Sequence, residues 1–272
     1  MEFDIELASY TDIGKIREKN EDSVLIAPEL CLGAVADGMG GHNAGEVASN
    51  LAVSTIRQML LDINAKKISV PEEFENGLPA ISRKLLYASF VANARIHRLA
   101  SENYRRRGMG TTLSAVYIED ANNACAVHIG DSRIYILRGS DLQQISNDHS
   151  FVMQQVAMGL ISKEEAAKSR IQNVLTKALG LRQEIKCDVI PLSPLEGDVY
   201  MICSDGVNKG ITDSQIFDIM ADPHLSPGKM CQQIVKVSAQ NDGKDNVSCV
   251  ILKVLPKTKR TFFETIIRKL KR

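Results

Sequence analysis

The sequence lacks the features of a membrane or secreted protein. No stretch approaches the roughly 20 consecutive apolar residues that a membrane-spanning helix needs. The N-terminal residues Met1–Asp4 have neither the basic start nor the apolar run of a signal peptide. Internal repeats and low-complexity segments are also missing. From these absences we expect a cytoplasmic protein without a transmembrane span.

Cysteine pairs with the spacing of a zinc or redox motif are absent as well. The chain has six cysteines, yet it contains no Cys-x-x-Cys pair. Most of the cysteines stand in apolar runs typical of strands, which favours reduced, buried thiols over a disulfide or zinc framework. They are Cys31, Cys125, Cys187, Cys203, Cys231 and Cys249.

The chain has no overall excess of charge of either sign, but its charge is unevenly placed. It holds 33 basic and 33 acidic residues, and 44% of its residues are hydrophobic, enough for a large core. Residues 257–272 hold seven Lys or Arg and one Glu, so 26 basic and 32 acidic residues remain elsewhere. A mildly acidic body argues against nucleic-acid binding, and we expect no nucleic-acid partner.

The basic C-terminal segment has the pattern of an amphipathic helix. Its apolar residues fall near one helical face; they are Phe262, Phe263, Ile266, Ile267 and Leu270. Such a helix can lie on an anionic membrane surface or dock on an acidic partner. Alternatively, its apolar face packs on the body of the protein. We treat residues 256–272 as a tail and residues 1–255 as one domain, because no convincing boundary precedes the tail.

Strands and helices are predicted in groups. Alternating or continuous apolar residues predict strands over 3–10, 24–27, 31–36, 111–118, 124–129, 133–137, 142–145, 185–191, 199–203 and 247–254. Helical periodicity predicts helices over 43–61, 81–103, 148–168 with a break at Gly159, 213–221 and 228–240. Hairpin runs of strands with helices grouped between them indicate an α+β fold, in which helices cover antiparallel sheets.

One stretch, residues 35–45, combines an acid with a glycine-rich loop. The apolar run before it predicts a buried strand that ends on Asp37. Four glycines follow within eight residues, and Asn43 with Glu46 resembles the capping box that starts a helix. A carboxylate beside exposed backbone carbonyls suits a hard cation such as Mg²⁺ or Mn²⁺. Asp-Gly is also an ordinary turn sequence, so this stretch alone does not decide between the two interpretations.

Further acids stand at predicted strand ends or tight turns. They are Glu21, Asp22, Asp131, Asp205 and Asp245. Strand ends on one side of a sheet converge in space, so these carboxylates and Asp37 can share a cavity. Clustered carboxylates repel one another and are costly to bury, and divalent cations usually compensate them. Two metal ions about 3.5–4 Å apart are a known arrangement for hydrolysis of phosphoryl esters.

Arg17 is a basic residue near the first of these acids. Its planar guanidinium matches the oxygens of a phosphate group. The alternative interpretation is an ordinary surface arginine.

Several short motifs, in order along the chain, resemble those of bacterial metal-dependent protein phosphatases of type 2C, the PPM family. The match runs from about Glu6 to Val254. The matching segments are Arg17-x-x-Asn20-Glu21-Asp22, Asp37-Gly38-Met39-Gly40-Gly41-His42, 108–112, 130–133, 148–150, 173–180, Ser204-Asp205-Gly206 and Asp245-Asn246-Val247. The resemblance implies an αββα sandwich of two antiparallel sheets with helix pairs outside, and residues 1–255 as a catalytic domain. It also implies hydrolysis of phosphoserine and phosphothreonine in proteins with Mn²⁺ or Mg²⁺.

The resemblance also implies roles for single residues. Asp37 resembles the carboxylate that bridges two core metal ions, and the Gly38 carbonyl resembles a ligand of one of them. Asp205 and Asp245 resemble ligands of the other ion. Glu21 and Asp22 resemble residues that hold metal-bound waters. Asp131, together with Asp205, resembles the site of a third, weaker ion. Arg17 resembles the arginine that binds phosphate. Residues 151–180 resemble the flap beside the active site.

The sequence departs from the eukaryotic pattern of this family at one position. Eukaryotic members place a histidine, a candidate general acid, directly after Asp-Gly, whereas Met39 stands there in this chain. His42 follows three residues later, and we expect it to have a structural role in the glycine loop. A metal-bound water could serve as the acid.

These residues predict a serine/threonine phosphatase in which a metal-bridged hydroxide attacks phosphorus without a phosphoenzyme. We expect its partners to be phosphoprotein substrates and a Ser/Thr kinase that it opposes in bacterial signalling. One alternative is a catalytically inactive phosphoprotein-binding module of the same fold, although every expected metal-binding acid is present. Another is a specialised phosphatase in a partner-switching circuit of a sigma factor.

Overall fold

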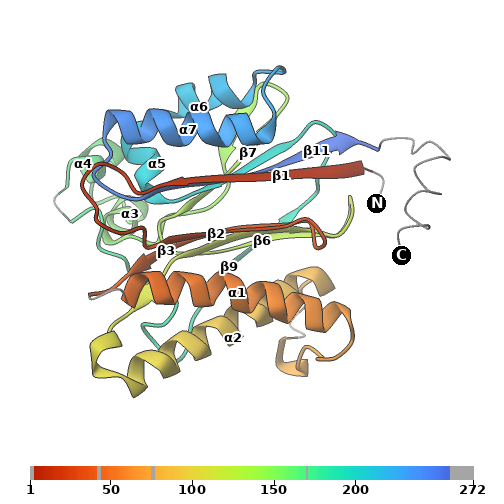
Figure 1. Ribbon diagram of the computed structural model, residues 1–272, viewed down its shortest axis with the longest axis vertical. Coiled ribbons are helices and arrows are strands. Elements are labelled where there is room, and N and C mark those ends of the chain that lie inside the picture. Colours follow the sequence, from red (N-terminus) through yellow and green to blue (C-terminus); the bar gives the residue numbers. More distant parts are fainter. Residues whose placement is uncertain (1–2, 42–43, 75–76, 170, 258–272) are drawn as a thin grey trace.

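The computed structural model describes residues 3–41, 44–74, 77–169 and 171–257. Some predictions concern residues outside these ranges. They are the structural role of His42, the capping of a helix by Asn43, and the amphipathic helix in the tail. Figure 1 shows two sheets stacked face to face, with helices on both outer sides.

The first sheet has five antiparallel strands in the order β1-β11-β10-β7-β8. They are β1 (Phe3–Asp12), β11 (Val247–Pro256), β10 (Val199–Cys203), β7 (Arg133–Arg138) and β8 (Asp141–Gln144). The first and last strands of the chain pair along their whole length, from Phe3 opposite Pro256 to Asp12 opposite Val247. This pairing places the first and last strands of the described chain side by side in one sheet.

The second sheet has six strands and is also antiparallel. Its main path is β2 (Asp22–Ala27), β3 (Leu32–Met39), β5 (Leu113–Ile118), β6 (Ala124–Ile129) and β9 (Asp188–Leu192), and the short β4 (Gly110–Thr111) pairs with β3.

Helices cover the outer face of each sheet. On the second sheet lie α1 (Ala44–Asn64) and α2 (Ala80–Glu102), and on the first lie α5 (Asp205–Gly210), α6 (Asp213–Met220) and α7 (Pro227–Asn241). The remaining helical segments are η1 (Glu72–Phe74), η2 (Tyr104–Arg106), α3 (Phe151–Ala157) and α4 (Lys163–Ala167). This arrangement confirms the predicted αββα sandwich.

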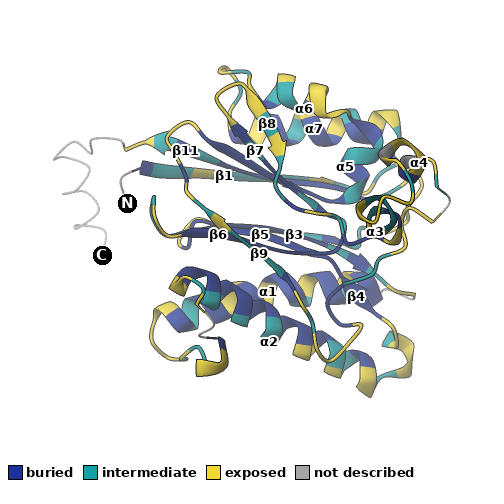
Figure 2. Cartoon of the chain, turned by 180° about the vertical axis from the view of Figure 1, so that it is seen from behind, coloured by how far each residue is buried: buried dark blue, intermediate teal, exposed yellow. Residues whose placement is uncertain are grey.

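The alternation of side chains along each strand divides the core into three layers, and Figure 2 shows that the inner strands of the two sheets are buried. On β3, Leu32 and Ala34 face α1 and α2, whereas Val35 faces the first sheet. Gly33 shares that inward face, where a Cβ would lie only 2.8 Å from the Leu252 side chain. Successive side chains of a strand point to opposite faces, so β3 supplies both a helix-facing layer and a layer between the sheets.

Two local predictions need correction. The strand predicted to end on Asp37 continues to Met39, because Gly38 and Met39 pair with Thr111 and Gly110 of β4. The Asp-Gly at 205–206 was predicted as a strand end alone, but Asp205 begins helix α5, with Ser204 as its N-cap residue.

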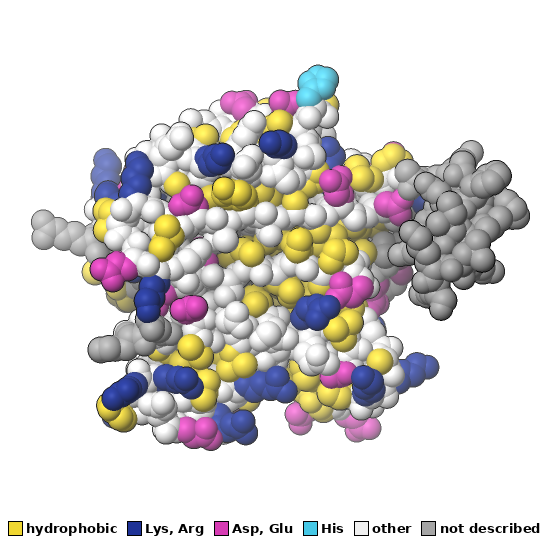
Figure 3. Space-filling model, in the orientation of Figure 1, with side chains coloured by type: hydrophobic (Ala, Val, Ile, Leu, Met, Phe, Trp, Pro, Cys, Tyr) yellow, Lys and Arg dark blue, Asp and Glu magenta, His cyan; other side chains and the backbone are white. Residues whose placement is uncertain are grey.

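The surroundings of the cysteines agree with the sequence analysis. All six cysteines are free and buried, as expected for reduced thiols. None of the described helices is long and apolar enough to cross a bilayer. On the face shown in Figure 3, acidic and basic side chains are interspersed over the surface.

Candidate active site

Two acids from neighbouring strands point into the space between the sheets. Asp22 and Asp37 lie directly opposite each other in the antiparallel pair β2 and β3. Each lies two residues from a valine of the layer between the sheets, Val24 or Val35. Because side chains alternate along a strand, Asp22 and Asp37 share that inward face at one end of the sandwich.

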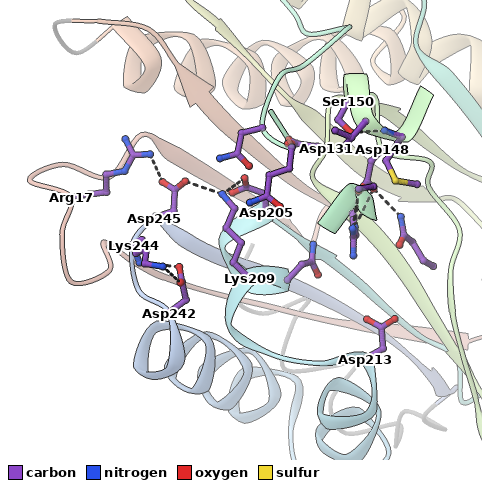
Figure 4. A pocket seen from close by; sticks show the side chains of 18 residues that line it. Arg17, Asp131, Asp148, Ser150, Asp205, Lys209, Asp213, Asp242, Lys244 and Asp245 are labelled. Atoms are coloured by element: carbon purple, nitrogen blue, oxygen red, sulfur yellow. Dashed lines mark hydrogen bonds and ion pairs between the residues drawn. The ribbon is translucent and has the colours of Figure 1, made fainter. Parts of the chain in front are cut away.

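Three more acids reach the same end from connecting segments. Asp131 lies in the turn between β6 and β7, where the chain passes from one sheet to the other. One residue, Ser204, separates Asp205 from the end of β10, and one residue, Asn246, separates Asp245 from the start of β11. Since β10 and β11 are antiparallel neighbours, the end of one strand lies beside the start of the other. Figure 4 shows these three side chains around one cavity.

Hydrogen bonds hold the loop from β1 to β2, which carries Arg17 and Glu21. The Asn246 side chain accepts a hydrogen bond from the Glu21 backbone N–H at 2.8 Å. Its Nδ2 donates to the Ile13 and Lys19 carbonyls at 3.0 and 2.9 Å. Asn246 therefore ties this loop to the start of β11, one residue from Asp245.

Gly38 and Gly45 allow close approach of the backbone beside Glu21. The Gly38 N–H donates to the Glu21 carbonyl at 3.1 Å. A Cβ on Gly38 would collide with the Gly45 backbone, and one on Gly45 would lie 2.6 Å from Glu21 Oε1. These two positions require glycine for steric reasons.

The acids raise one another's affinity for protons. Burial raises the pKa of Asp37 well above its usual value, and four neighbouring carboxylates, Asp22, Asp205, Asp131 and Asp245, raise it further. Burial also raises the pKa of Asp22 and of Asp131 to about 7, with nearby acids adding to the effect. Asp37 thus lies at the electrostatic centre of the cluster.

Two cations contact the exposed side of this cluster. Arg17 Nη2 lies 2.8 Å from Asp245 Oδ1. Lys209 forms an ion pair with Asp205 and a second one with Asp245 Oδ2 at 3.2 Å. Figure 4 shows Arg17, Asp245, Lys209 and Asp205 as one chain of charged contacts.

The chemistry of the cluster fits a divalent metal ion. Its groups are carboxylate oxygens, which Mg²⁺ and Mn²⁺ prefer. Asp22 Oδ1 and Asp205 Oδ1 are buried without a hydrogen-bond partner in the described part of the chain, an arrangement that is costly unless another group compensates it. In residues 3–257, apart from the masked positions, no group of three His, Cys, Asp or Glu side chains is already arranged to hold a metal ion. The acids lie at the same end of the sandwich, and Lys209 and Arg17 form ion pairs with carboxylate oxygens of Asp205 and Asp245.

A cavity of about 830 Å³ opens over Asp131, Asp205 and Asp245. Arg17 and Lys209 line it on one side, and α3 residues Val152 and Met153 on the other. Its far wall includes Asp148, which accepts hydrogen bonds from Arg133 at 2.8 to 3.1 Å. This volume lies in the range of about 300–1,000 Å³ that is typical of ligand-binding sites.

Comparison with known proteins identifies the family. A family model for protein phosphatase 2C matches residues 18–239. The chain belongs to the protein phosphatase 2C family. This confirms the predicted family, and the chain is a serine/threonine protein phosphatase. Phosphatases of this family depend on Mn²⁺ or Mg²⁺, as the sequence analysis expected.

Curated relatives of this phosphatase come from bacteria. Protein phosphatase PhpP of Streptococcus pneumoniae is 31% identical over 252 residues, which are 91% of this chain and 97% of PhpP. Serine/threonine protein phosphatase PstP of Mycobacterium tuberculosis is 33% identical over 248 residues, which are 91% of this chain and 45% of PstP. This phosphatase therefore spans less than half the length of PstP.

Solved structures show the same architecture. The crystal structure of the M. tuberculosis phosphatase PstP/Ppp superposes with a TM-score of 0.80 at 32% identity, covering 93% of this chain and 99% of that one. The catalytic domain of PstP in complex with two manganese ions has a TM-score of 0.77 at 32% identity, covering 92% and 98%.

Sequence reasoning missed three residues that organise the site of this phosphatase. Asn246 was noted only as part of a motif, and its hydrogen bonds to the β1–β2 loop join segments more than 200 residues apart. Ser204 donates from its hydroxyl to Asp22 Oδ2 at 2.8 Å and so connects the two sheets. Lys209 was overlooked because its i,i+4 relation to Asp205 exists only in a helix that was not predicted.

Proposed function

We propose that this phosphatase hydrolyses phosphoserine and phosphothreonine in proteins at the acid cluster, with two core Mn²⁺ or Mg²⁺ ions, and that it opposes Ser/Thr kinases in bacterial signalling. The observation that carries the proposal is the position of Asp37 among four other carboxylates that raise its pKa. Such a cluster is costly to keep ionised without compensating cations. The bacterial phosphatases among its relatives support the signalling role.

The proposal assigns a role to each acid. Asp37 would hold the core ions together with the Gly38 carbonyl on one side and with Asp205 and Asp245 on the other. Glu21 and Asp22 would orient metal-bound waters. Asp131, together with Asp205, would hold a third, weaker ion. The manganese complex of PstP supports the choice of metal and the number of core ions.

The chain's own groups then have defined tasks in the reaction. When bound, the metal ions acidify a water molecule and so supply the nucleophile at neutral pH. Arg17, half exposed at the mouth of the cavity, binds the phosphoryl oxygens and stabilises their charge. The nearby Cys203 does not act as the nucleophile, because it is fully buried and burial raises its pKa to about 12.

The surroundings of the site suit protein substrates. The segment 151–180, proposed as a flap, contributes Val152 and Met153 to the cavity and exposes Met158 and Leu160 to solvent. Exposed apolar side chains beside a cavity suit contact with a polypeptide. We include a cytoplasmic location in the proposal, since six free cysteines suit a reducing compartment.

The direct test is hydrolysis of a phosphothreonine peptide with and without Mn²⁺, followed by addition of EDTA. The proposal expects phosphate release that requires the metal and stops with EDTA. Binding of the peptide without any release at saturating Mn²⁺ would instead favour an inactive phosphoprotein-binding module.

A further inference from the structure

We infer that the Lys209 ammonium is a built-in cation that competes with the metal ions for Asp205 and Asp245. It holds these two carboxylates together in the metal-free protein and has to leave them when metal binds. Lys209 thereby sets the metal concentration at which the enzyme becomes active. The inference rests on the proposed metal site, and its test separates the two.

The first support is the pairing of the carboxylate oxygens. Asp245 Oδ1 contacts Arg17 Nη2 at 2.8 Å, and Asp245 Oδ2 contacts Lys209 Nζ at 3.2 Å. Asp205 Oδ2 also pairs with Lys209. Both oxygens of Asp245 and one of Asp205 are therefore engaged by cationic side chains. A metal ion that uses these two acids as proposed has to displace at least the ammonium.

The second support is how firmly Lys209 is held at this position. It lies on α5, one helical turn after Asp205, and its side chain is only 24% exposed. Helix α5 packs closely on α7: a Cβ on Gly210 would collide with the Ser238 backbone. The Asn241 side chain also donates to the Gly210 carbonyl at 2.8 Å. This packing fixes helix α5 beside the acids, so the Lys209 ammonium can leave them only through a change in its own side-chain rotamers.

The third support is that one ammonium pairs with two proposed metal ligands at once. Lys209 contacts both Asp205 and Asp245, so it offsets part of the repulsion between these carboxylates. Removing it leaves them more repulsive without metal and freer to bind metal.

Lys244 provides a matched control in the same cavity. Its Nζ lies 3.0 Å from Asp242 Oδ1, and its side chain is 73% exposed. Asp242 is outside the proposed ligand set. Lys244→Met therefore removes the same charge from the same cavity without freeing a proposed metal ligand.

The experiment compares Lys209→Met, Lys209→Gln and Lys244→Met with the unaltered full chain at pH 8. Calorimetry measures Mn²⁺ affinity, and thermal denaturation is followed in EDTA and in saturating Mn²⁺. Both Lys209 variants should bind Mn²⁺ about tenfold more tightly, as expected for loss of a competing charge-assisted contact. In EDTA they should melt at a lower temperature than the unaltered protein, and Mn²⁺ should remove that difference. Lys244→Met should behave as the unaltered protein.

Equal or weaker Mn²⁺ binding by both Lys209 variants would overturn the inference, because Lys209 would then support the metal site and not compete for it. If a Lys209 variant unfolds in EDTA, it is purified in Mn²⁺ and titrated with EDTA. The inference then expects unfolding together with metal loss, at a higher EDTA concentration than the unaltered protein needs to lose its metal. Absence of Mn²⁺ binding by the unaltered protein would refute the proposed function itself.

Discussion

At the scale of single residues, Asp37 sits where strand alternation would otherwise place an apolar side chain. Val35, two residues earlier, fills the layer between the sheets. A carboxylate at this inward position raises the free energy of the fold unless a cation compensates it. Asp37 therefore appears in the sequence as a break in the hydrophobic pattern of a buried strand, as expected of a residue that serves the proposed site and not the packing of the core.

Arg17 is the residue whose loss should affect substrate binding most directly. We expect Arg17→Ala to raise KM for a phosphothreonine peptide about tenfold, since a charge-assisted hydrogen bond contributes on the order of 1.5–3 kcal/mol. Steady-state kinetics at saturating Mn²⁺ measure this. A fall in kcat alone, with KM unchanged, would assign Arg17 to the transition state only.

A variant at Asp131 should distinguish binding of the core ions from binding of the third ion. We expect Asp131→Ala to keep the two core ions and to lose the weaker one, because Asp37 and Asp245 remain in place. Activity on phosphoproteins should fall. Counting bound Mn²⁺ by calorimetry tests this, and loss of the core pair as well would contradict the assignment.

At the scale of elements, most strands and helices follow from periodicity. The residues of β10 and β11 alternate between two buried layers, so their apolar runs could be recognised from sequence. Helix α5 could not, since its six residues are too few for a periodic signal and Asp-Gly resembles a turn. The extension of β3 past Asp37 depends on pairing with β4, a contact that local sequence cannot reveal.

The acids of the proposed site could be predicted from motifs, but their contacts could not. The turn at Asp131 and the strand ends at Asp205 and Asp245 were apparent in the sequence. The hydrogen bonds of Asn246 and Ser204 connect residues that are distant in sequence, and the sequence carries no local signal for such pairs. The roles of the acids rest on family resemblance and remain predictions.

The C-terminal tail should be dispensable for catalysis. Strand β11 ends at Pro256, opposite Phe3, so deletion of residues 257–272 removes none of its pairing with β1. We expect unchanged melting temperature and unchanged hydrolysis of a small phosphopeptide, with weaker binding to anionic liposomes or to a partner kinase. A less stable or less active truncated protein would show instead that the tail packs on the body.

At the scale of the whole molecule, the acid cluster should make stability depend on both pH and metal. The pKa of Asp22 and of Asp131 is raised to about 7 in the folded protein, from a usual value of 3.8. The folded state therefore binds these protons more tightly than the unfolded state does. The resulting stabilisation is complete below about pH 4 and is lost as the pH rises through about 7.

We accordingly expect the melting temperature of the EDTA-treated protein to fall between about pH 5 and pH 8 as these carboxylates ionise. Mn²⁺ binds the ionised carboxylates, so its stabilising effect should grow over the same range. Thermal denaturation at several pH values, with EDTA or with Mn²⁺, measures both trends. A melting temperature in EDTA that rises with pH would contradict this electrostatic account.

The central claim is that the cluster around Asp37 binds the metal ions on which hydrolysis depends. Its most direct test is a Mn²⁺ titration of the unaltered protein and of Asp37→Asn, with bound metal and phosphothreonine hydrolysis measured in the same samples. The account predicts that activity appears as two equivalents bind, and that Asp37→Asn folds but loses the core pair together with turnover. Near-normal hydrolysis by Asp37→Asn at saturating Mn²⁺ would contradict it.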